Sequence, residues 1–303
     1  MHELIGRGGM AEVYRANLLG PSGFSKVVAL KKIHPFYAND RHFQELFLNE
    51  ARLLAKLSHP NIVQVLQVGF DDDSPYLILE WIEGRTLKQI LENTLLGKRL
   101  LPEPVIRSIM KGILSALVAA HEFEDPETGR TAPIIHRDLS PHNVMIDKNG
   151  MVKVLDFGVA KILGGKGDFT KSEAFKGKFP YMSPEMVLGE QVSERSDLFS
   201  LGIICFEMLT GSRLFRGNSD FECLELIKKG SIPEISSLRP SVSEALAGFT
   251  MKLLRKNPME RMPSAKVALK ELAAIKRPKY ASPAKMARLA TINGFRQSYP
   301  LLG

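Results

Sequence analysis

The sequence predicts an α+β protein in which a strand-rich N-terminal part precedes a larger, mainly helical part. Residues 27–33 and 76–83 are short apolar runs with the composition of strands. After Gly84 the pattern changes to that of helices. Residues 102–121 have apolar side chains at three- and four-residue spacing, and residues 197–209 are apolar nearly all round. We therefore place the boundary between two lobes at Gly84.

The composition is that of a globular protein, with 303 residues, 44% of them hydrophobic and 24% charged. No apolar run is long enough to span a bilayer, and the first residues lack the basic and apolar regions of a signal peptide. Cys205 and Cys223 form no disulfide framework, which favours a reducing compartment. We therefore expect a cytoplasmic protein without a transmembrane segment.

The net charge of +8 is concentrated at the C-terminus. Residues 276–303 contain six basic residues and no acidic residue, which leaves about +2 on residues 1–275. A nearly neutral body does not match the basic face of a nucleic-acid binder, so we expect no nucleic-acid partner. Residues 276–303 are expected to form a flexible, solvated basic tail. Docking of this tail on an acidic partner is the alternative.

The most informative stretch is IHRDLSPHN at residues 135–143, followed thirteen residues later by Asp156 and the rest of a DFG sequence. Two short apolar runs around an Asn-Gly pair lie between them, which is the pattern of a β-hairpin. A hairpin brings its ends together, so Asn143 and Asp156 are expected side by side, with Asp138 just before them. Such oxygen ligands suit Mg²⁺. The alternative, that each Asp or Asn only forms a turn, explains any one of them but not their spacing.

HRDLSPHN followed by DFG resembles the catalytic and metal-binding loops of bacterial eukaryotic-like (Hanks-type) serine/threonine protein kinases. The resemblance spans roughly residues 4–275. It implies a bilobal protein kinase fold, with a small antiparallel N-lobe sheet, one N-lobe helix and a larger helical C-lobe. It also implies ATP and Mg²⁺ as cofactors, with Mn²⁺ as an alternative metal. Asp138 would accept the proton of the substrate hydroxyl, and Asn143 and Asp156 would hold the metal.

A glycine-rich hairpin is expected at residues 5–14, IGRGGMAEVY. The backbone N–H groups of its glycines can approach phosphate oxygens because no Cβ intervenes. No helix follows, which excludes a Walker A loop and a Rossmann turn. The resemblance gives this hairpin the phosphate-binding glycines and the apolar lid over adenine: Gly6, Gly8, Gly9, Ile5 and Val13.

A buried ion pair is expected between the strand at residues 27–33 and the helix at residues 41–57. Lys31 lies on the same strand face as Ala29, and Glu50 falls on the apolar stripe of the helix. Burying an unpaired carboxylate costs on the order of several kcal/mol, so Glu50 needs a cation, and Lys31 is the natural partner. This matches the lysine and helix glutamate that hold the α- and β-phosphates of ATP in kinases.

Residues 76–84 are expected to form a buried strand that runs into a hinge. By resemblance, Leu79 takes the gatekeeper position, and the backbone of Glu80 and Ile82 meets the adenine edge. Ala29 and Met145 complete the adenine pocket that the resemblance implies. The kinase domain is then expected over residues 1–275, with an N-lobe at 1–79, a hinge at 80–84 and a C-lobe at 85–275.

The long stretch from Gly158 to Glu185 lacks periodicity, and a loop of this length inside a compact domain is usually functional. Its closing SPE resembles the APE that ends the activation segment of kinases. The resemblance makes Thr170 and Ser172 autophosphorylation sites, and Arg137 could pair with a phosphate placed there.

Two structural anchors are also implied by the resemblance. Asp197, at the start of the buried helix, would hold the backbone of the catalytic loop. Arg261, in the late NPMER motif, would pair with Glu185 of SPE.

The sequence departs from the kinase pattern at two positions. Ser140 stands where most serine/threonine kinases of the family have Lys, and Lys178 stands where they have Thr. We hypothesise that the two changes compensate, with the Lys178 ammonium replacing near Asp138 the cation lost at position 140. The alternative is that Lys178 points to solvent.

The function expected from these motifs is ATP-dependent phosphoryl transfer to Ser and Thr hydroxyls of proteins, with autophosphorylation in the activation segment. Trans-autophosphorylation would bring two copies together as a homodimer. A pseudokinase scaffold that binds ATP is the alternative, for which Ser140 leaves room. A small-molecule phosphotransferase of the aminoglycoside type shares an Asp–Asn loop, but SPE and Arg261 favour a protein substrate.

Overall fold

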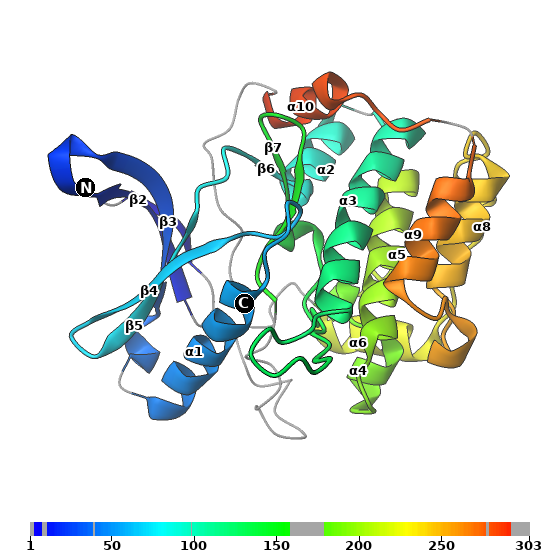
Figure 1. Ribbon diagram of the computed structural model, residues 1–303. Helices are drawn as coiled ribbons and strands as arrows, with labels where there is room; N and C mark the ends of the chain where they lie inside the picture. Colours follow the sequence, from blue (N-terminus) through cyan, green and yellow to red (C-terminus); the bar gives the residue numbers. More distant parts are fainter. Residues whose placement is uncertain are drawn as a thin grey trace.

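The computed structural model describes residues 3–7, 11–38, 40–97, 99–157, 179–276 and 279–291. Two lobes are evident: a small twisted sheet with one helix, and a larger body of helices beside it (Figure 1). The arrangement confirms the predicted bilobal α+β architecture. Gly84 begins the short strand β6 (Gly84–Thr86), and the first C-lobe helix follows it at Leu87.

The N-lobe contains a five-stranded antiparallel sheet in the order β1-β2-β3-β5-β4. Its strands are β1 (Glu3–Arg7), β2 (Ala11–Leu19), β3 (Ser25–Ile33), β4 (Val65–Asp71) and β5 (Ser74–Glu80). Helix α1 (Arg41–Lys56) packs against β4 and β5. It begins at Asp40, whose carboxylate accepts hydrogen bonds from the backbone N–H groups of His42 and Phe43. The face of α1 that points toward the sheet is apolar except at Glu50.

The C-lobe is built around α5 (Glu194–Thr210), which is buried on nearly all sides, as its apolar sequence predicts. Its N-terminus has a capping box between Ser193 and Ser196, and Gly211 ends it with a φ of 69°. The other helices are α2 (Leu87–Leu96), α3 (Glu103–His121), α4 (Pro184–Leu188), α6 (Asp220–Lys229), α7 (Ile235–Leu238), α8 (Glu244–Leu253), α9 (Ala265–Ala274) and α10 (Pro283–Thr291).

Helix α3 packs against α5 and α9 in the middle of this body. Within the described residues it is the one helix whose length and composition would suffice to cross a membrane, but 67% of its most apolar stretch is buried inside the protein. A long apolar helix enclosed by its neighbours is the normal core of a helical domain.

A second, three-stranded sheet lies between the lobes, in the order β6-β7-β8. It consists of β6 (Gly84–Thr86), β7 (Val144–Asp147) and β8 (Val152–Val154). Strands β7 and β8 form the antiparallel hairpin that the sequence predicts around the Asn-Gly pair. Both ends of this hairpin therefore point to the same place, next to the catalytic loop.

Residues 279–291 differ from the flexible, solvated tail that the sequence suggested for residues 276–303. Residues 283–291 form α10, which lies against β6, β7 and α3 (Figure 1). The reason is amphipathicity: Met286 is 3% exposed, while Lys285 and Arg288 on the same helix are exposed to solvent. This short basic helix thus packs through buried Met286 and partly buried Leu289.

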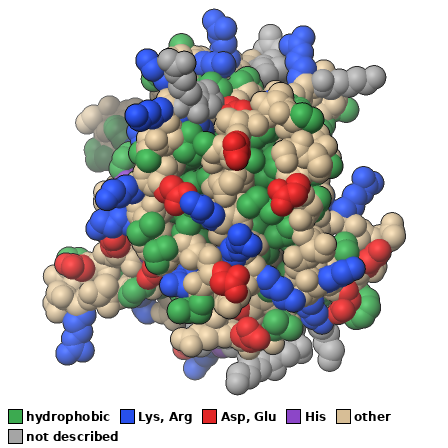
Figure 2. All heavy atoms as spheres, turned by 90° about the vertical axis from the view of Figure 1, so that its right-hand side faces the viewer, with side chains coloured by type: hydrophobic (Ala, Val, Ile, Leu, Met, Phe, Trp, Pro, Cys, Tyr) green, Lys and Arg blue, Asp and Glu red, His purple; other side chains and the backbone are tan. Residues whose placement is uncertain are grey.

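The C-lobe surface that includes α8 and α9 has basic and acidic side chains interspersed (Figure 2). Mixed signs on this face produce no strong field of one sign.

A buried carboxyl group in α5 makes the stability of the fold depend on pH. Glu207 is 6% exposed, and its Oε2 accepts a hydrogen bond of 2.8 Å from the hydroxyl of Tyr181. Burial raises the pKa of Glu207 to about 7. The folded state therefore holds this proton more tightly than the unfolded state, so folding loses stability as pH rises from 4.5 through 7.

We expect Glu207→Gln to remove this loss, since its amide does not titrate. The free energy of unfolding of the variant, relative to the parent, should rise by roughly 2.5 kcal/mol between about pH 5 and pH 8.5. Urea unfolding at both pH values measures this difference, and other groups cancel because both proteins contain them. A relative stability that is constant with pH would contradict the raised pKa.

Candidate active site

Three charged side chains meet between the lobes. The ammonium of Lys31, on β3, lies 3.0 Å from Oε1 of Glu50 on α1 and 2.9 Å from Oδ1 of Asp156, which follows β8. Burial alone would lower the pKa of Lys31, but the charges of Asp156 and Glu50 raise it above its ordinary value. One ammonium between two carboxylates leaves an excess of negative charge, which attracts a further cation.

The β7–β8 hairpin places Asn143 and Asp156 at its two ends. The backbone N–H of Leu155 donates to the carbonyl of Asn143 at 2.8 Å, which holds the two ends together. Asp138 joins them because Nδ2 of Asn143 donates to its carbonyl at 2.9 Å and to its Oδ2 at 3.0 Å. The structure thus brings together the three oxygen-bearing side chains that the sequence singled out.

The oxygens at this end of the hairpin fit a hard cation. Oδ1 of Asn143 and Oδ2 of Asp156 are buried and have no hydrogen-bond partner among the residues that the structure describes. Buried acceptors without donors are costly, and a cation would satisfy both. No cluster of three His, Cys, Asp or Glu that could hold a metal occurs in the described part of the chain. Two protein ligands, with the remaining positions left for water and phosphate oxygens, are typical of Mg²⁺.

Asp197 of α5 holds the backbone of the loop at residues 135–143. Its carboxylate accepts hydrogen bonds from the backbone N–H groups of His136 and Arg137, at 2.8 and 2.9 Å. Burial raises the pKa of Asp197, but the hydrogen bond and charge of His121 outweigh it, so the pKa lies below its usual value. Arg137 has a φ of 61°, a conformation that is rare outside glycine, and these bonds help to hold it there.

Two histidines have structural roles that the sequence analysis did not assign. His121, the last residue of α3, lies 2.8 Å from Asp197. His136 accepts a hydrogen bond from the N–H of Asp138 at Nδ1 and donates from Nε2 to the carbonyl of Leu155. Burial lowers the pKa of His136, so the ring is neutral and can do both. The sequence signal for the structural role of His121 was its position on the buried side of an apolar helix.

The apolar residues expected around adenine form the small core between the sheet and the hairpin. It contains Val13, Ala29, Leu79, Ile82 and Met145, all buried, and Ile5 packs against it. Glu80 lies at the end of β5, where its carboxylate pairs with Lys153 and accepts a hydrogen bond from the N–H of Gln64. Gly6 is paired with Val13 in the first hairpin. Apolar side chains from four N-lobe strands, from Ile82 and from β7 thus pack into one cluster.

Several expected site residues lie outside the described residues, so their positions remain predictions: Gly8, Gly9, Thr170, Ser172 and Lys178. Ser140 is described and is 1% exposed, with its hydroxyl oxygen lacking a hydrogen-bond partner in the described part of the chain. The side chain of Ser140 thus supplies no charge at this position.

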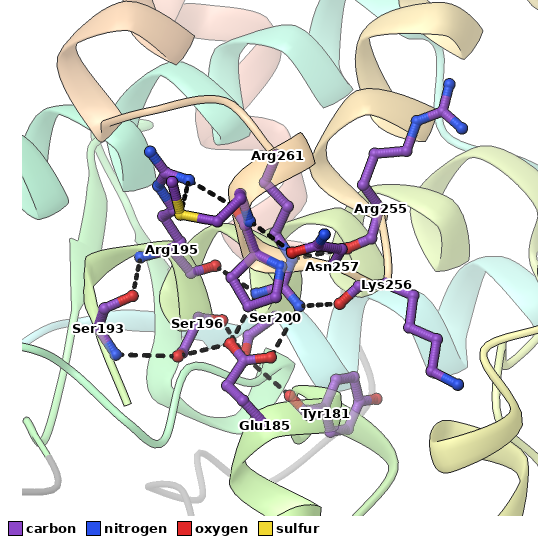
Figure 3. A network of polar contacts seen from close by, with 12 residues as sticks. Tyr181, Glu185, Ser193, Arg195, Ser196, Ser200, Arg255, Lys256, Asn257 and Arg261 are labelled. Atoms are coloured by element: carbon purple, nitrogen blue, oxygen red, sulfur yellow. Dashed lines mark hydrogen bonds and ion pairs between the residues drawn. The ribbon is translucent and has the colours of Figure 1, made fainter. Parts of the chain in front are cut away.

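Glu185 and Arg261 form a buried bidentate pair behind the site, with distances of 2.6 and 2.7 Å (Figure 3). The guanidinium of Arg261 also donates to the carbonyls of Arg195, Arg255 and Lys256, so each of its N–H-bearing nitrogens has a partner. Burial raises the pKa of Glu185, but the hydrogen bonds from Arg261 outweigh it and lower the pKa. This pair joins the first turn of α4 to the distant loop that includes Arg261.

Comparison with known proteins gives a consistent result. A family model described as "Protein kinase domain" matches residues 1–272. Similar relatives include the tyrosine-protein kinase MasK of Myxococcus xanthus, with 37% identity over 261 residues, covering 86% of this chain and 40% of that protein. Serine/threonine-protein kinase PrkC of Bacillus subtilis is 36% identical over 262 residues, covering 86% of this chain and 38% of that protein. The chain thus spans less than half the length of these relatives.

Proposed function

The chain belongs to the protein kinase family, and from this premise we propose that it transfers the γ-phosphate of ATP to serine and threonine hydroxyls of proteins. The observation that supports this best is the convergence of Lys31, Asp156 and Asn143 at one rim with Asp138. Such an array can position a nucleoside triphosphate and a hydroxyl acceptor. Phosphoryl transfer is catalysed mostly by such positioning together with electrostatic stabilisation.

We assign the phosphate and metal roles as follows. Lys31, oriented by Glu50, would hold the α- and β-phosphates, and the glycine hairpin would cover them with its N–H groups. Asn143 and Asp156 would hold Mg²⁺, or Mn²⁺ in its place, through the buried oxygens that lack a hydrogen-bond partner in the described part of the chain. The metal, when bound, neutralises charge on the phosphates. Adenine would occupy the apolar space bounded by the residues already described, with the backbone of Glu80 and Ile82 at its edge.

Asp138 would orient the acceptor hydroxyl and take its proton as the oxygen attacks phosphorus. Asn143 donates a hydrogen bond of 3.0 Å to the Asp138 carboxylate, which would fix the orientation of that carboxylate for the acceptor hydroxyl. Asp197 would keep this loop in place through the backbone of residues 136 and 137.

The acceptor and the activation segment require a direct test, because one similar relative is named a tyrosine kinase and another a serine/threonine kinase. Arg137 Nε is buried without a hydrogen-bond partner in the described residues, and we propose that it pairs with phosphorylated Thr170 or Ser172. We expect the purified chain, given labelled ATP and Mg²⁺, to incorporate phosphate on Ser and Thr, including Thr170 and Ser172 by mass spectrometry.

Other results of this assay would count against the proposal. Label on tyrosine alone would contradict the proposed acceptor. Nucleotide binding without any transfer, to itself or to added proteins, would favour the scaffold alternative. In the same assay, a Lys178→Ala variant with the parental kcat would contradict the hypothesis that Lys178 compensates for Ser140.

We further propose a cytoplasmic setting, protein substrates and a transient homodimer for trans-autophosphorylation. Cys205 and Cys223 are buried free thiols, which agrees with a reducing compartment. Any docking of an acidic partner would use the exposed basic side chains of the C-terminal segment, such as Lys279 and Lys285, since Met286 faces the protein.

A further inference from the structure

The segment that follows the matched kinase domain is fixed along α3. The guanidinium carbon of Arg107 lies 4.4 Å from the ring centroid of Tyr280, and the ammonium of Lys111 lies 5.2 Å from it. The backbone N–H of Ala281 donates to the carbonyl of Pro104 and to the hydroxyl of Ser108, at 3.0 and 2.9 Å. These contacts start within ten residues of the last residue that the family model matches, residue 272.

From there, α10 rests on the turn of the β7–β8 hairpin. Met286 is the one residue of α10 that is fully buried. Gly150, in the turn, has a φ of 85°, and a Cβ at this position would lie 2.6 Å from the carbonyl oxygen of Pro283 and 2.7 Å from Cβ of Met286. The turn and α10 therefore approach so closely that only glycine fits between them.

The same turn is bonded to the hinge. The backbone N–H of Lys148 donates to the carbonyl of Glu83 at 2.7 Å, and the two side chains form an ion pair of 2.7 Å. Gly84 pairs with Asp147 across β6 and β7. A displacement of the turn would therefore move Glu83 and Gly84, the last residues of the hinge.

The inner end of the hairpin is the proposed nucleotide site. Met145 on β7 belongs to the apolar space for adenine, and Asn143 and Asp156 are at the two hairpin ends. Helix α10 thus lies on the outside of a corner, made of hinge, β6 and the hairpin, whose inside faces the nucleotide.

We propose that α10 positions this corner for nucleotide binding, with Met286 and Gly150 as the positioning residues. The proposal rests on the function proposed above, because it assumes that the corner binds ATP. Docked α10 holds the hairpin turn in place, and the turn holds the hinge backbone through Glu83. The hairpin then keeps its two ends, which carry Asn143 and Asp156, in the positions that metal binding requires. The kinase unit of this chain would then extend to residue 291, beyond the boundary at 275 that the sequence suggested.

Two matched pairs of variants of the 303-residue chain, with Met286→Leu as a further control, test whether α10 positions the corner or only covers its surface. Met286→Asp places a charge in the buried contact and should undock α10, whereas Ala284→Asp places the same charge on the exposed face of α10. Met286→Leu keeps the apolar contact. Gly150→Ala adds a Cβ against α10, whereas Gly129→Ala adds one at a similar φ of 62° with nothing within 4 Å.

The two readouts are the dissociation constant of Mg²⁺–ADP, by equilibrium titration, and hydrogen exchange of residues 80–86 and 144–152. We expect Met286→Asp and Gly150→Ala to weaken nucleotide binding about fivefold and to speed exchange in both segments. The controls Ala284→Asp, Met286→Leu and Gly129→Ala should stay within about twofold of the parent.

The proposal fails if residues 283–291 exchange freely in Met286→Asp while the nucleotide affinity and the exchange of residues 80–86 match the parent. If the parent itself binds no nucleotide, the proposed function fails instead, and the exchange of residues 80–86 still decides whether α10 fixes the hinge. If Met286→Asp does not fold, Gly150→Ala against Gly129→Ala gives the same comparison.

Discussion

Asp138→Asn is expected to lower kcat for phosphoryl transfer about a thousandfold, the range typical for loss of a positioned proton acceptor. An amide cannot take the proton of the acceptor hydroxyl. It is nearly the same shape as the carboxylate and can still accept the hydrogen bond from Nδ2 of Asn143, so the loop should keep its structure. Rates with a protein substrate and labelled ATP, with a separate nucleotide titration, measure the effect.

Asp147→Asn is the matched control. Asp147 lies on the same hairpin, and its Oδ1 accepts from the N–H groups of Asn149 and Met151, which an amide oxygen can also do. This control should retain its kcat and its melting temperature. If Asp138→Asn kept a tenth or more of the parental kcat while binding nucleotide normally, the role given to Asp138 would be wrong.

Arg261→Met is expected to lower the free energy of unfolding by about 3–5 kcal/mol, because it leaves the Glu185 carboxylate buried without its cation. The side chains of the pair are 0% and 2% exposed, so water cannot replace the lost bonds. Three backbone carbonyls also lose their donor. Urea unfolding at neutral pH measures the loss.

Arg255→Met tests whether the effect belongs to the buried pair. Arg255 comes from the same loop and is exposed, with its side chain directed away from the network (Figure 3). Its loss should change stability by no more than about 0.5 kcal/mol. Adding Glu185→Leu to Arg261→Met should recover part of the stability, since it removes the unpaired charge. Equal losses for Arg255→Met and Arg261→Met would contradict this account.

Short-range patterns predicted much of the site. The helical spacing that put Glu50 on an apolar stripe, with Lys31 on a strand face, predicted their pairing, and the structure places them 3.0 Å apart. The Asn-Gly turn predicted the hairpin that brings the ends at Asn143 and Asp156 together. These predictions depend on the three- and four-residue spacing of helices and the return of a two-stranded hairpin.

Contacts between distant segments were predicted only where the kinase resemblance supplied them. Nothing in the local pattern indicates that Asp197 reaches the backbone N–H groups of His136 and Arg137, or that Arg261 reaches Glu185 76 residues away. Both contacts are made by polar side chains that sequence periodicity treats as surface residues.

By itself, the sequence determined the α+β class and predicted that Lys31 would pair with Glu50 and that Asn143 and Asp156 would lie at the two ends of one hairpin, because each depends on local periodicity or turn chemistry. Only the tertiary structure decided that Lys31 is shared between Glu50 and Asp156, and that residues 283–291 pack as α10. The physical reason is that both depend on surfaces contributed by distant segments. The local sequence pattern around Met286 does not identify its contact with Gly150, which lies in a distant turn.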